Sequence, residues 1–303
     1  MQAVWMLLSS FVFATMGVCV KYASEHFNSA ELVFYRGLVG VVVMAIYARA
    51  RGTSLRTDYL SMHAWRSVIG VMSLSAWFYA IAHLPLATAM TLNYMSSVWI
   101  AAFLVGGSLM LGKAGQKGPS QGPLVMAILA SFAGVVMLLR PAMDQNQTFA
   151  GLIGLMSGLG AAFAYMQVMS IARLGEPETR TVFYFAVGTA VAGALGMLVT
   201  GISPWNWQHA LWIPPLGILA SLGQLCMTKA YSMTSGTGNH SGTLMVANLQ
   251  YSGIVFAALY SLILFGDDIP LIGWAGMGLI IVSAIAATVL RARAAPNAPA
   301  EDH

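Results

Sequence analysis

Charged side chains are scarce in this chain. Asp, Glu, Lys and Arg make up 8% of its 303 residues, whereas soluble domains carry roughly 25%. Hydrophobic residues account for 58%. Because so few polar side chains cannot cover a surface in water, most of the outside must face lipid. The composition therefore predicts an all-α membrane protein.

Cysteines and catalytic motifs are also nearly absent. Cys19 and Cys226 lie inside apolar runs, which excludes a disulfide framework and a cysteine-rich metal site. The chain has no H-E-x-x-H and no P-loop, so we expect no metal, no cofactor and no ATP hydrolysis. An intramembrane enzyme is the alternative from another class, but Asp267-Asp268 has no second acidic cluster with which to hold a metal-bound diphosphate.

Apolar runs near the length that crosses a bilayer, roughly 20 residues, recur along the whole chain. Charges, prolines and Gly/Asn clusters separate ten of them. The predicted spans are 2–23, 29–49, 63–83, 86–111, 121–140, 149–172, 179–201, 210–231, 240–265 and 269–291. Only His83-Leu84-Pro85 separates the third span from the fourth, so one long kinked helix is the alternative there.

The basic residues lie at the ends of apolar runs. The net charge of +4 is not gathered into one stripe, so we expect no nucleic-acid partner. Cytoplasmic loops of membrane proteins are rich in Lys and Arg, and placing both termini inside leaves only Lys21 and Arg140 on the outer side. This predicts a multi-pass protein of the bacterial inner membrane, with residues 292–303 as a disordered cytoplasmic tail.

Two short matches suggest an internal duplication. Val33-Phe34-Tyr35 returns as Val182-Phe183-Tyr184, and residues 82–89 resemble residues 230–237 in nearly the same register. The predicted repeats are residues 1–140 and 149–291. Because each holds five helices, an odd number, the copies would have opposite orientations, as in secondary transporters that bind substrate near the midplane.

Several segments carry a family resemblance. They are Met16-Gly17-Val18, Lys21-Tyr22, residues 31–36, Arg66, Trp77-Phe78-Tyr79-Ala80, Leu84-Pro85-Leu86-Ala87 with Ala89, and Lys229-Ala230-Tyr231-Ser232-Met233. With these, the chain resembles the EamA-type carriers of the drug/metabolite transporter superfamily, and within it the branch of S-adenosylmethionine carriers. The resemblance implies ten helices around a central cavity lined by spans one, three, four, six, eight and nine. Leu111-Gly112-Lys113 lacks the acid that often ends span four, and the stretch 235–243 is longer than its first-half counterpart.

Polar and aromatic residues inside the spans are the candidates for substrate binding, because such groups in hydrocarbon need partners or water. Gln224, Thr228 and Tyr231 share one face of span eight. Hydrogen bonding between helices is the alternative reading for that face. The full candidate set is Lys21, Trp77, Tyr79, Asn93, Tyr94, Tyr165, Gln167, Gln224, Thr228, Tyr231, Asn248 and Tyr251.

Two further charges fall inside predicted spans. Glu31 and Arg36 are candidates for ion coupling or for a structural charge, and pairing of Arg36 with a neighbouring helix is favoured over substrate contact. Lys21 could attract an anion or extend toward the outer headgroups. One cation among amides, hydroxyls and rings suits an uncharged or zwitterionic solute.

These observations predict a secondary transporter that works by alternating access. The expected cargo is a small organic metabolite such as an amino acid, an amino-acid derivative or a nucleoside-like compound, with export favoured. An uptake carrier for S-adenosylmethionine or a related cofactor or vitamin is the alternative. Membrane lipid is the other expected partner, and a homodimer is left open because spans five and ten have almost no interior polar residue.

Overall fold

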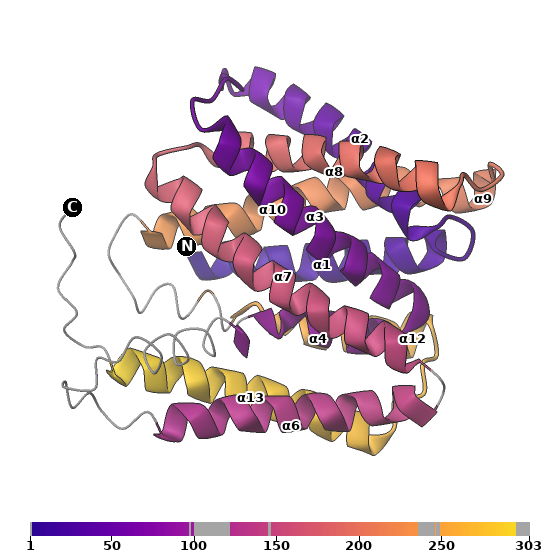
Figure 1. The fold of residues 1–303 in the computed structure, drawn as a ribbon, viewed down its shortest axis with the longest axis vertical. Coiled ribbons are helices and arrows are strands. Elements are labelled where there is room, and N and C mark those ends of the chain that lie inside the picture. Colours follow the sequence, from indigo (N-terminus) through magenta and orange to yellow (C-terminus); the bar gives the residue numbers. More distant parts are fainter. Residues whose placement is uncertain are drawn as a thin grey trace.

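The computed structural model describes residues 2–96, 98–99, 122–144, 147–235, 246 and 249–294. Within these ranges every regular element is a helix (Figure 1). The helices are α1 (Gln2–Ala23), α2 (Ser29–Ala50), α3 (Leu60–His83), α4 (Leu86–Tyr94), α6 (Gly122–Asp144), α7 (Thr148–Arg173), α8 (Glu178–Thr200), α9 (Trp207–Ala210), α10 (Ile213–Ser235), α12 (Ser252–Leu264) and α13 (Leu271–Ala294). Most predicted span boundaries fall within a few residues of these helix ends.

The break between the third and fourth predicted spans is real. α3 ends at His83, Leu84 is extended with φ −120° and ψ 161°, and α4 begins at Leu86. Pro85 accounts for this geometry, since a proline pushes the residue before it away from helical dihedrals. The alternative of one long kinked helix is therefore excluded. The rest of span four and much of span nine lie outside the described residues.

Large apolar side chains cover the outside of the bundle. Val199 is 88% exposed and Ile263 is 74% exposed, and similar residues occur on almost every long helix. Among the described residues, five helices are long and apolar enough to cross a membrane, and three shorter apolar helices accompany them. A surface of this kind is stable in lipid, not in water, so the chain is a multi-pass membrane protein.

The most extensive helix contacts form four pairs: α2 with α8, α6 with α13, α3 with α7, and α1 with α10. Two of these pairs, α2 with α8 and α6 with α13, can be followed at opposite sides of the bundle in Figure 1. Each pair joins a first-half helix to a second-half helix. Exchanging equivalent helices of the two halves maps this set of pairs onto itself, as an inverted repeat requires.

The loops that follow α2 and α8 show the same relation in detail. Gly52 and Gly201 both have positive φ, 63° and 79°, and lie 149 residues apart, the spacing of the two Val-Phe-Tyr segments. Two residues later, Arg180 Nε donates to the Ser54 carbonyl at 2.7 Å, while Ser203 N donates to Glu31 Oε1 at 2.9 Å. A residue at the start of each of these helices, Glu31 in α2 and Arg180 in α8, thus forms a hydrogen bond with the loop that follows the other helix. The two residues occupy equivalent positions and carry opposite charges.

A buried acid secures the end of the bundle where α7 gives way to α8. Glu176 Oε2 lies 3.1 Å from His63 Nε2, and Arg180 Nη1 lies 3.0 Å from Glu176 Oε1. Burial alone would raise the pKa of Glu176, but hydrogen bonds from His63, Thr57 and Arg180 outweigh it and hold that pKa below its usual range. The cluster joins the start of α3 to the start of α8.

Glycines allow α2 and α8 to approach closely. A Cβ added at Gly37 would overlap the backbone of Ala190, and one added at Gly193 would overlap the backbone of Phe34. Small residues at helix crossings are the usual device for close packing in membranes. The pair α2–α8 therefore depends on the absence of side chains at these two positions.

We predict that Gly37→Ala lowers the thermal stability of the detergent-solubilised protein. The added methyl must displace backbone rather than a flexible side chain, which costs about 1–3 kcal/mol. Gly278→Ala is the matched control, because an added Cβ there meets nothing within 4 Å. It should leave the melting temperature unchanged or raise it slightly; equal melting temperatures for the two variants would contradict the close-packing account.

Candidate functional site

A cavity lined by charged, amide and aromatic side chains lies inside the bundle. It is formed mainly by the middle parts of helices from both halves, with Phe13 near the centre of α1 and Gln224 near the centre of α10. The lining residues are Phe13, Arg36, Arg66, Gly70, Ser73, Leu74, Trp77, Asn93, Tyr94, Ala161, Ala164, Tyr165, Phe185 and Gln224. None of these described lining residues is acidic.

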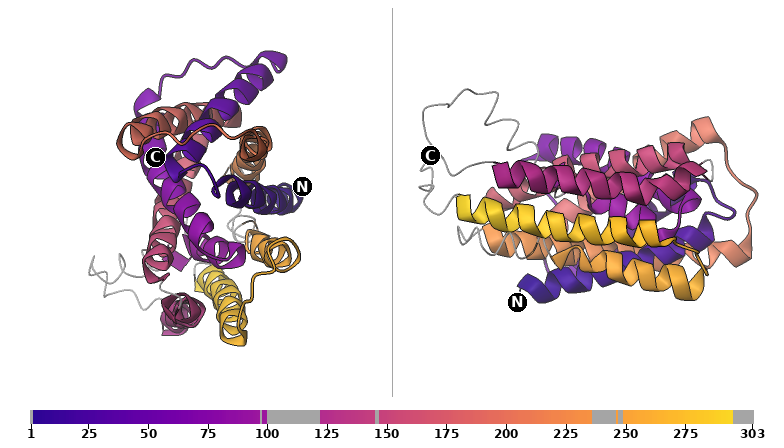
Figure 2. Two further views of the ribbon diagram at one scale, coloured as in Figure 1. Left: turned by 90° about the vertical axis from the view of Figure 1, so that its right-hand side faces the viewer. Right: turned by 90° about the horizontal axis from the view of Figure 1, so that it is seen from below.

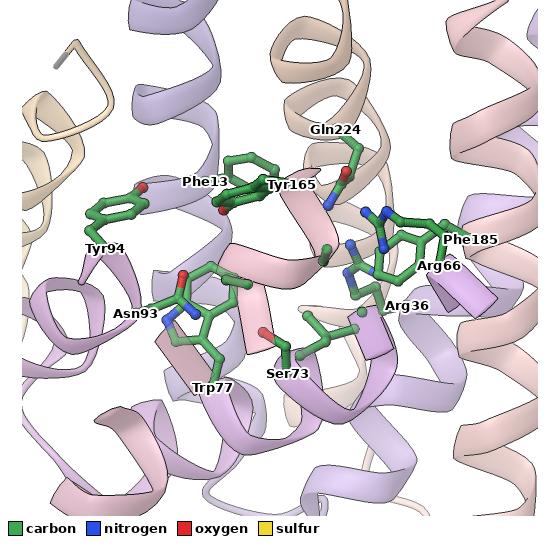
Figure 3. Close-up of a pocket in the computed structure, with 14 residues that line it drawn as sticks. Phe13, Arg36, Arg66, Ser73, Trp77, Asn93, Tyr94, Tyr165, Phe185 and Gln224 are labelled. Carbon is green, nitrogen blue, oxygen red and sulfur yellow. The ribbon is translucent and has the colours of Figure 1, made fainter. Parts of the chain in front are cut away.

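The two sides of the cavity differ in chemistry (Figure 3). Arg36, Arg66 and Phe185 gather on one side, while Trp77 and the α4 residues lie on the other. This arrangement gives a cationic side and an aromatic and amide side. A solute that is charged at one end and planar or polar at the other fits both.

Part of the predicted site is brought together by this cavity. Trp77, Asn93, Tyr94, Tyr165 and Gln224 all line it, as does Arg36. They come from α2, α3, α4, α7 and α10. Their contact with a substrate stays a prediction. Four of these helices, α3, α4, α7 and α10, correspond to spans that the family resemblance placed at the cavity.

Neighbouring helices position the α4 amide. Asn93 Nδ2 donates to Ser157 Oγ at 3.0 Å, and Ser157 Oγ donates in turn to the Gly154 carbonyl at 2.6 Å. Ser73 Oγ donates to the Ser157 carbonyl at 2.8 Å. Because the Asn93 amide nitrogen is held in this way, the lining geometry on the α3, α4 and α7 side is set before any solute arrives.

A second group of predicted residues lies next to the cavity. Gln250 Nε2 donates to Tyr165 Oη at 3.2 Å, and Tyr231 Oη donates to Gln250 Oε1 at 3.4 Å. Thr228 and Tyr251 are also buried. Thr228 is close in sequence to Tyr231, and Tyr251 directly follows Gln250. Asn248 lies outside the described residues, and Gln167 is half-buried without lining the cavity.

Gln250 was missed by the sequence reasoning for a physical reason. A continuous helix through residues 241–252 would place Gln250 off the polar face, but residues 250 and 251 form a turn and α12 begins only at Ser252. Helical spacing therefore does not apply there. The polar segment Gln250-Tyr251-Ser252 directly before Gly253 was the available signal.

Lys21 lies at the end of the bundle opposite the chain termini and does not line the cavity. Its Nζ is 3.1 Å from Asp267 Oδ2 and donates to the Leu84 carbonyl at 3.4 Å. Ser261 Oγ also donates to Asp267, at 2.6 Å. This network joins α1, the α3–α4 turn and the loop after α12. Tyr79 lies toward the same end, stacked on His83 with ring centroids 4.1 Å apart.

The Glu31 carboxylate caps the start of α2. It forms a capping box with Asn28 at the start of α2, and it accepts hydrogen bonds from Ser203 N at 2.9 Å and Ser203 Oγ at 2.7 Å. The carboxylate is fully buried. Burial of a charge is tolerated when several donors satisfy it, and here all of them come from helix starts and loops.

Two arginines stand out in the cavity. Arg36 is 4% exposed and Arg66 is 3% exposed, and both guanidinium groups lie against the ring of Phe185, at 5.2 and 4.2 Å from its centroid. On sequence alone, Arg66 was placed at the start of the third predicted span, among the charges of the cytoplasmic side, and not among the site candidates. α3 begins at Leu60, so Arg66 is already inside the helix, on one face with Gly70, Ser73 and Trp77, and that spacing was the available signal.

Comparison with known proteins relates the first half of the chain to a transporter family. Residues 1–140 match the EamA-like transporter family. These residues therefore form an EamA-like transporter domain. The predicted resemblance to EamA-type carriers is confirmed, and with it the interpretation as a transporter of small metabolites.

Individual relatives align over most of the chain. The pseudopaline exporter CntI of Pseudomonas aeruginosa PAO1 is 29% identical over 280 residues, which is 92% of this chain and 93% of that protein. A riboflavin transporter of Vibrio cholerae is 23% identical over 294 residues, covering 93% and 90%. A crystal structure shares the fold with a TM-score of 0.64 at 20% identity, covering 96% of this chain and 97% of the other. The closer likeness to S-adenosylmethionine carriers stays a prediction.

We predict that Asp267→Asn loosens the end of the bundle closed by Lys21. Both side chains are less than one-fifth exposed, so losing the pair should cost about 1–2 kcal/mol, between a surface and a buried ion pair. The adjacent Asp268→Asn is the control, because Asp268 is exposed. Thermal unfolding of Asp267→Asn, of Lys21→Met and of the variant with both substitutions gives a double-mutant cycle. Additive effects in that cycle, or an equal loss in Asp268→Asn, would contradict the closure.

Proposed function

We propose that this protein is a secondary transporter that moves a small organic metabolite across the bacterial inner membrane by alternating access. The observation that supports this most strongly is a cavity between apolar membrane helices that is lined by charged, amide and hydroxyl groups. Such a cavity costs solvation energy unless a polar solute uses it. The EamA domain and the relatives named as transporters agree with that use.

The packing supports a particular form of alternating access. Helices of the two halves are paired across the repeat, so the moving bodies would be mixed pairs such as α1–α10 and α3–α7 rather than residues 1–140 against residues 149–291. The cavity lies between these pairs. Breaking the Lys21–Asp267 contact would open one end while the contacts around Glu176 hold the other.

Charge distribution supports a cytoplasmic position for both termini. α1 begins and α13 ends at the same end of the bundle (Figure 2). Basic side chains of the described residues at that end are Arg49, Arg51, Arg56, Arg173, Arg180 and Lys229, whereas Lys21 is at the opposite end. An excess of Lys and Arg marks the cytoplasmic side.

Export is the favoured direction, in keeping with the exporter name of the Pseudomonas relative. Transport of a cofactor or vitamin is the alternative, which the riboflavin transporters among the relatives support. The aromatic side of the cavity, with Trp77, Tyr94 and Tyr165, suits a planar ring in either case. The two readings differ in cargo and direction but share one binding cavity.

The test is a comparison of released and accumulated metabolites between overexpressing and deletion cells of the host. At least one small metabolite should change in opposite senses in the two strains. Gln224→Ala should reduce that change in metabolite level, because it removes about 1–3 kcal/mol of hydrogen bonding to the solute. This loss corresponds to a rise of about 5- to 150-fold in the dissociation constant of the solute.

Leu222→Ala is the matched control, since Leu222 is exposed on the outer side of α10. It should leave transport unchanged at equal protein abundance. No metabolite difference between the strains would contradict the transport function. Equal loss in both variants would remove Gln224 from the binding surface.

A further inference from the structure

We propose that Arg36 and Arg66 together bind a carboxylate group of the transported solute, so that the cargo crosses the membrane as an organic anion. This inference rests on the proposed transport function and names the class of its substrate. It assigns the two arginines a shared role that neither residue's position in the sequence suggests.

Unpaired hydrogen-bond donors are the first support. The Nε atoms of both arginines and Nη1 of Arg66 are buried and have no acceptor in the described part of the chain. The hydrogen bond from Arg36 Nη1 to Thr189 Oγ1 is long, at 3.5 Å. Each guanidinium carries five donors in a planar fork that matches a carboxylate. The arginines therefore present more buried donors than the described residues around them accept from.

The positions of the acidic residues are the second support. Every carboxylate whose side chain the structure describes lies in a loop or at a helix end: Glu25, Glu31, Asp58, Glu176, Glu178, Asp267 and Asp268. None of them forms an ion pair with Arg36 or Arg66 among the described residues. A buried charge is usually paired, so two neighbouring cations without an acid call for an anion from outside the chain.

The arginine site is also shaped by its surroundings. The Phe185 ring contacts both guanidinium groups, and cations over an aromatic face are stabilised without using their N–H donors. Gly70 provides the space, because a Cβ there would overlap Arg66 Nη1 and come within 2.8 Å of Phe185 Cε2. Phe185 and Gly70 thus hold the guanidinium of Arg66 in place while its donors stay available.

The rest of the cavity indicates an organic carboxylate rather than a lipid headgroup. The arginines are on one side of the cavity, and Trp77, Asn93 and Tyr94 are on the other (Figure 3). Aromatic faces and amides there can hold the body of a small solute. A headgroup would need its acyl chains to leave the cavity between packed helices.

The test uses purified full-length protein in detergent with two isosteric probes, 3-phenylpropanoate and 3-phenylpropanamide. The carboxylate should raise the melting temperature and bind in calorimetry, and the amide should bind at least about tenfold more weakly. Arg36→Gln and Arg66→Gln should each lose about 10- to 150-fold in carboxylate affinity, the range for a charged hydrogen bond. Arg51→Gln, a change at an exposed arginine, should keep it.

Stability without ligand separates binding from structure. Because both buried guanidinium groups lack an acidic partner, Arg66→Gln should melt at the same temperature as the wild type or higher. A structural role predicts the reverse. If a variant fails to fold, comparing the affinities of the two probes for the wild type still tests whether the site binds a carboxylate.

Several results would overturn the proposal. They are equal binding of amide and carboxylate, binding of neither, unchanged carboxylate affinity in Arg66→Gln, tighter binding of phenyl phosphate, and displacement of the carboxylate by phosphatidylglycerol. Cells that transport a neutral metabolite would keep the transport function and reject the arginine site. Carboxylate binding without any metabolite change in cells would reject the transport function but not the arginine site.

Discussion

Two guanidinium groups buried inside an apolar helix bundle impose the strongest constraint on this structure. A cation in hydrocarbon is costly, and Arg36 and Arg66 have no acidic partner among the described residues that would offset the cost. Phe185 and Gly70 accommodate the guanidinium groups without using up their donors. An anionic solute that moves through the cavity would account for both the cost and the free donors.

The architecture around the arginines follows from the pairing of first-half helices with second-half helices. α2 and α8 approach closely through glycines, and the start of each holds the loop that follows the other. Closing contacts occur at both ends of the bundle, through Lys21 with Asp267 and through Glu176 with His63. Separate contacts at the two ends of the bundle, with the cavity between them, are what the proposed alternating access needs.

The sequence predicted the fold well and the site in part. Composition, apolar runs and the Pro85 break gave the helices, because lipid imposes length and apolarity on every span. Trp77, Asn93, Tyr94, Tyr165 and Gln224 converge in the structure. The sequence did not point to Arg66 or Gln250 as site residues, since the first was counted among the charges at the start of its span and the second lies in a turn. Which polar residues face one another depends on helix pairing, and no single-sequence pattern contains that pairing.

The most direct measurement is an experimental structure of the protein purified from its host together with its transported solute. The account predicts density for a small organic anion with a carboxylate oxygen within hydrogen-bond distance of both guanidinium groups, and with the remainder of the solute against Trp77 and Tyr94. A protein carboxylate paired with Arg36 or Arg66, or a solute bound away from both arginines, would contradict it.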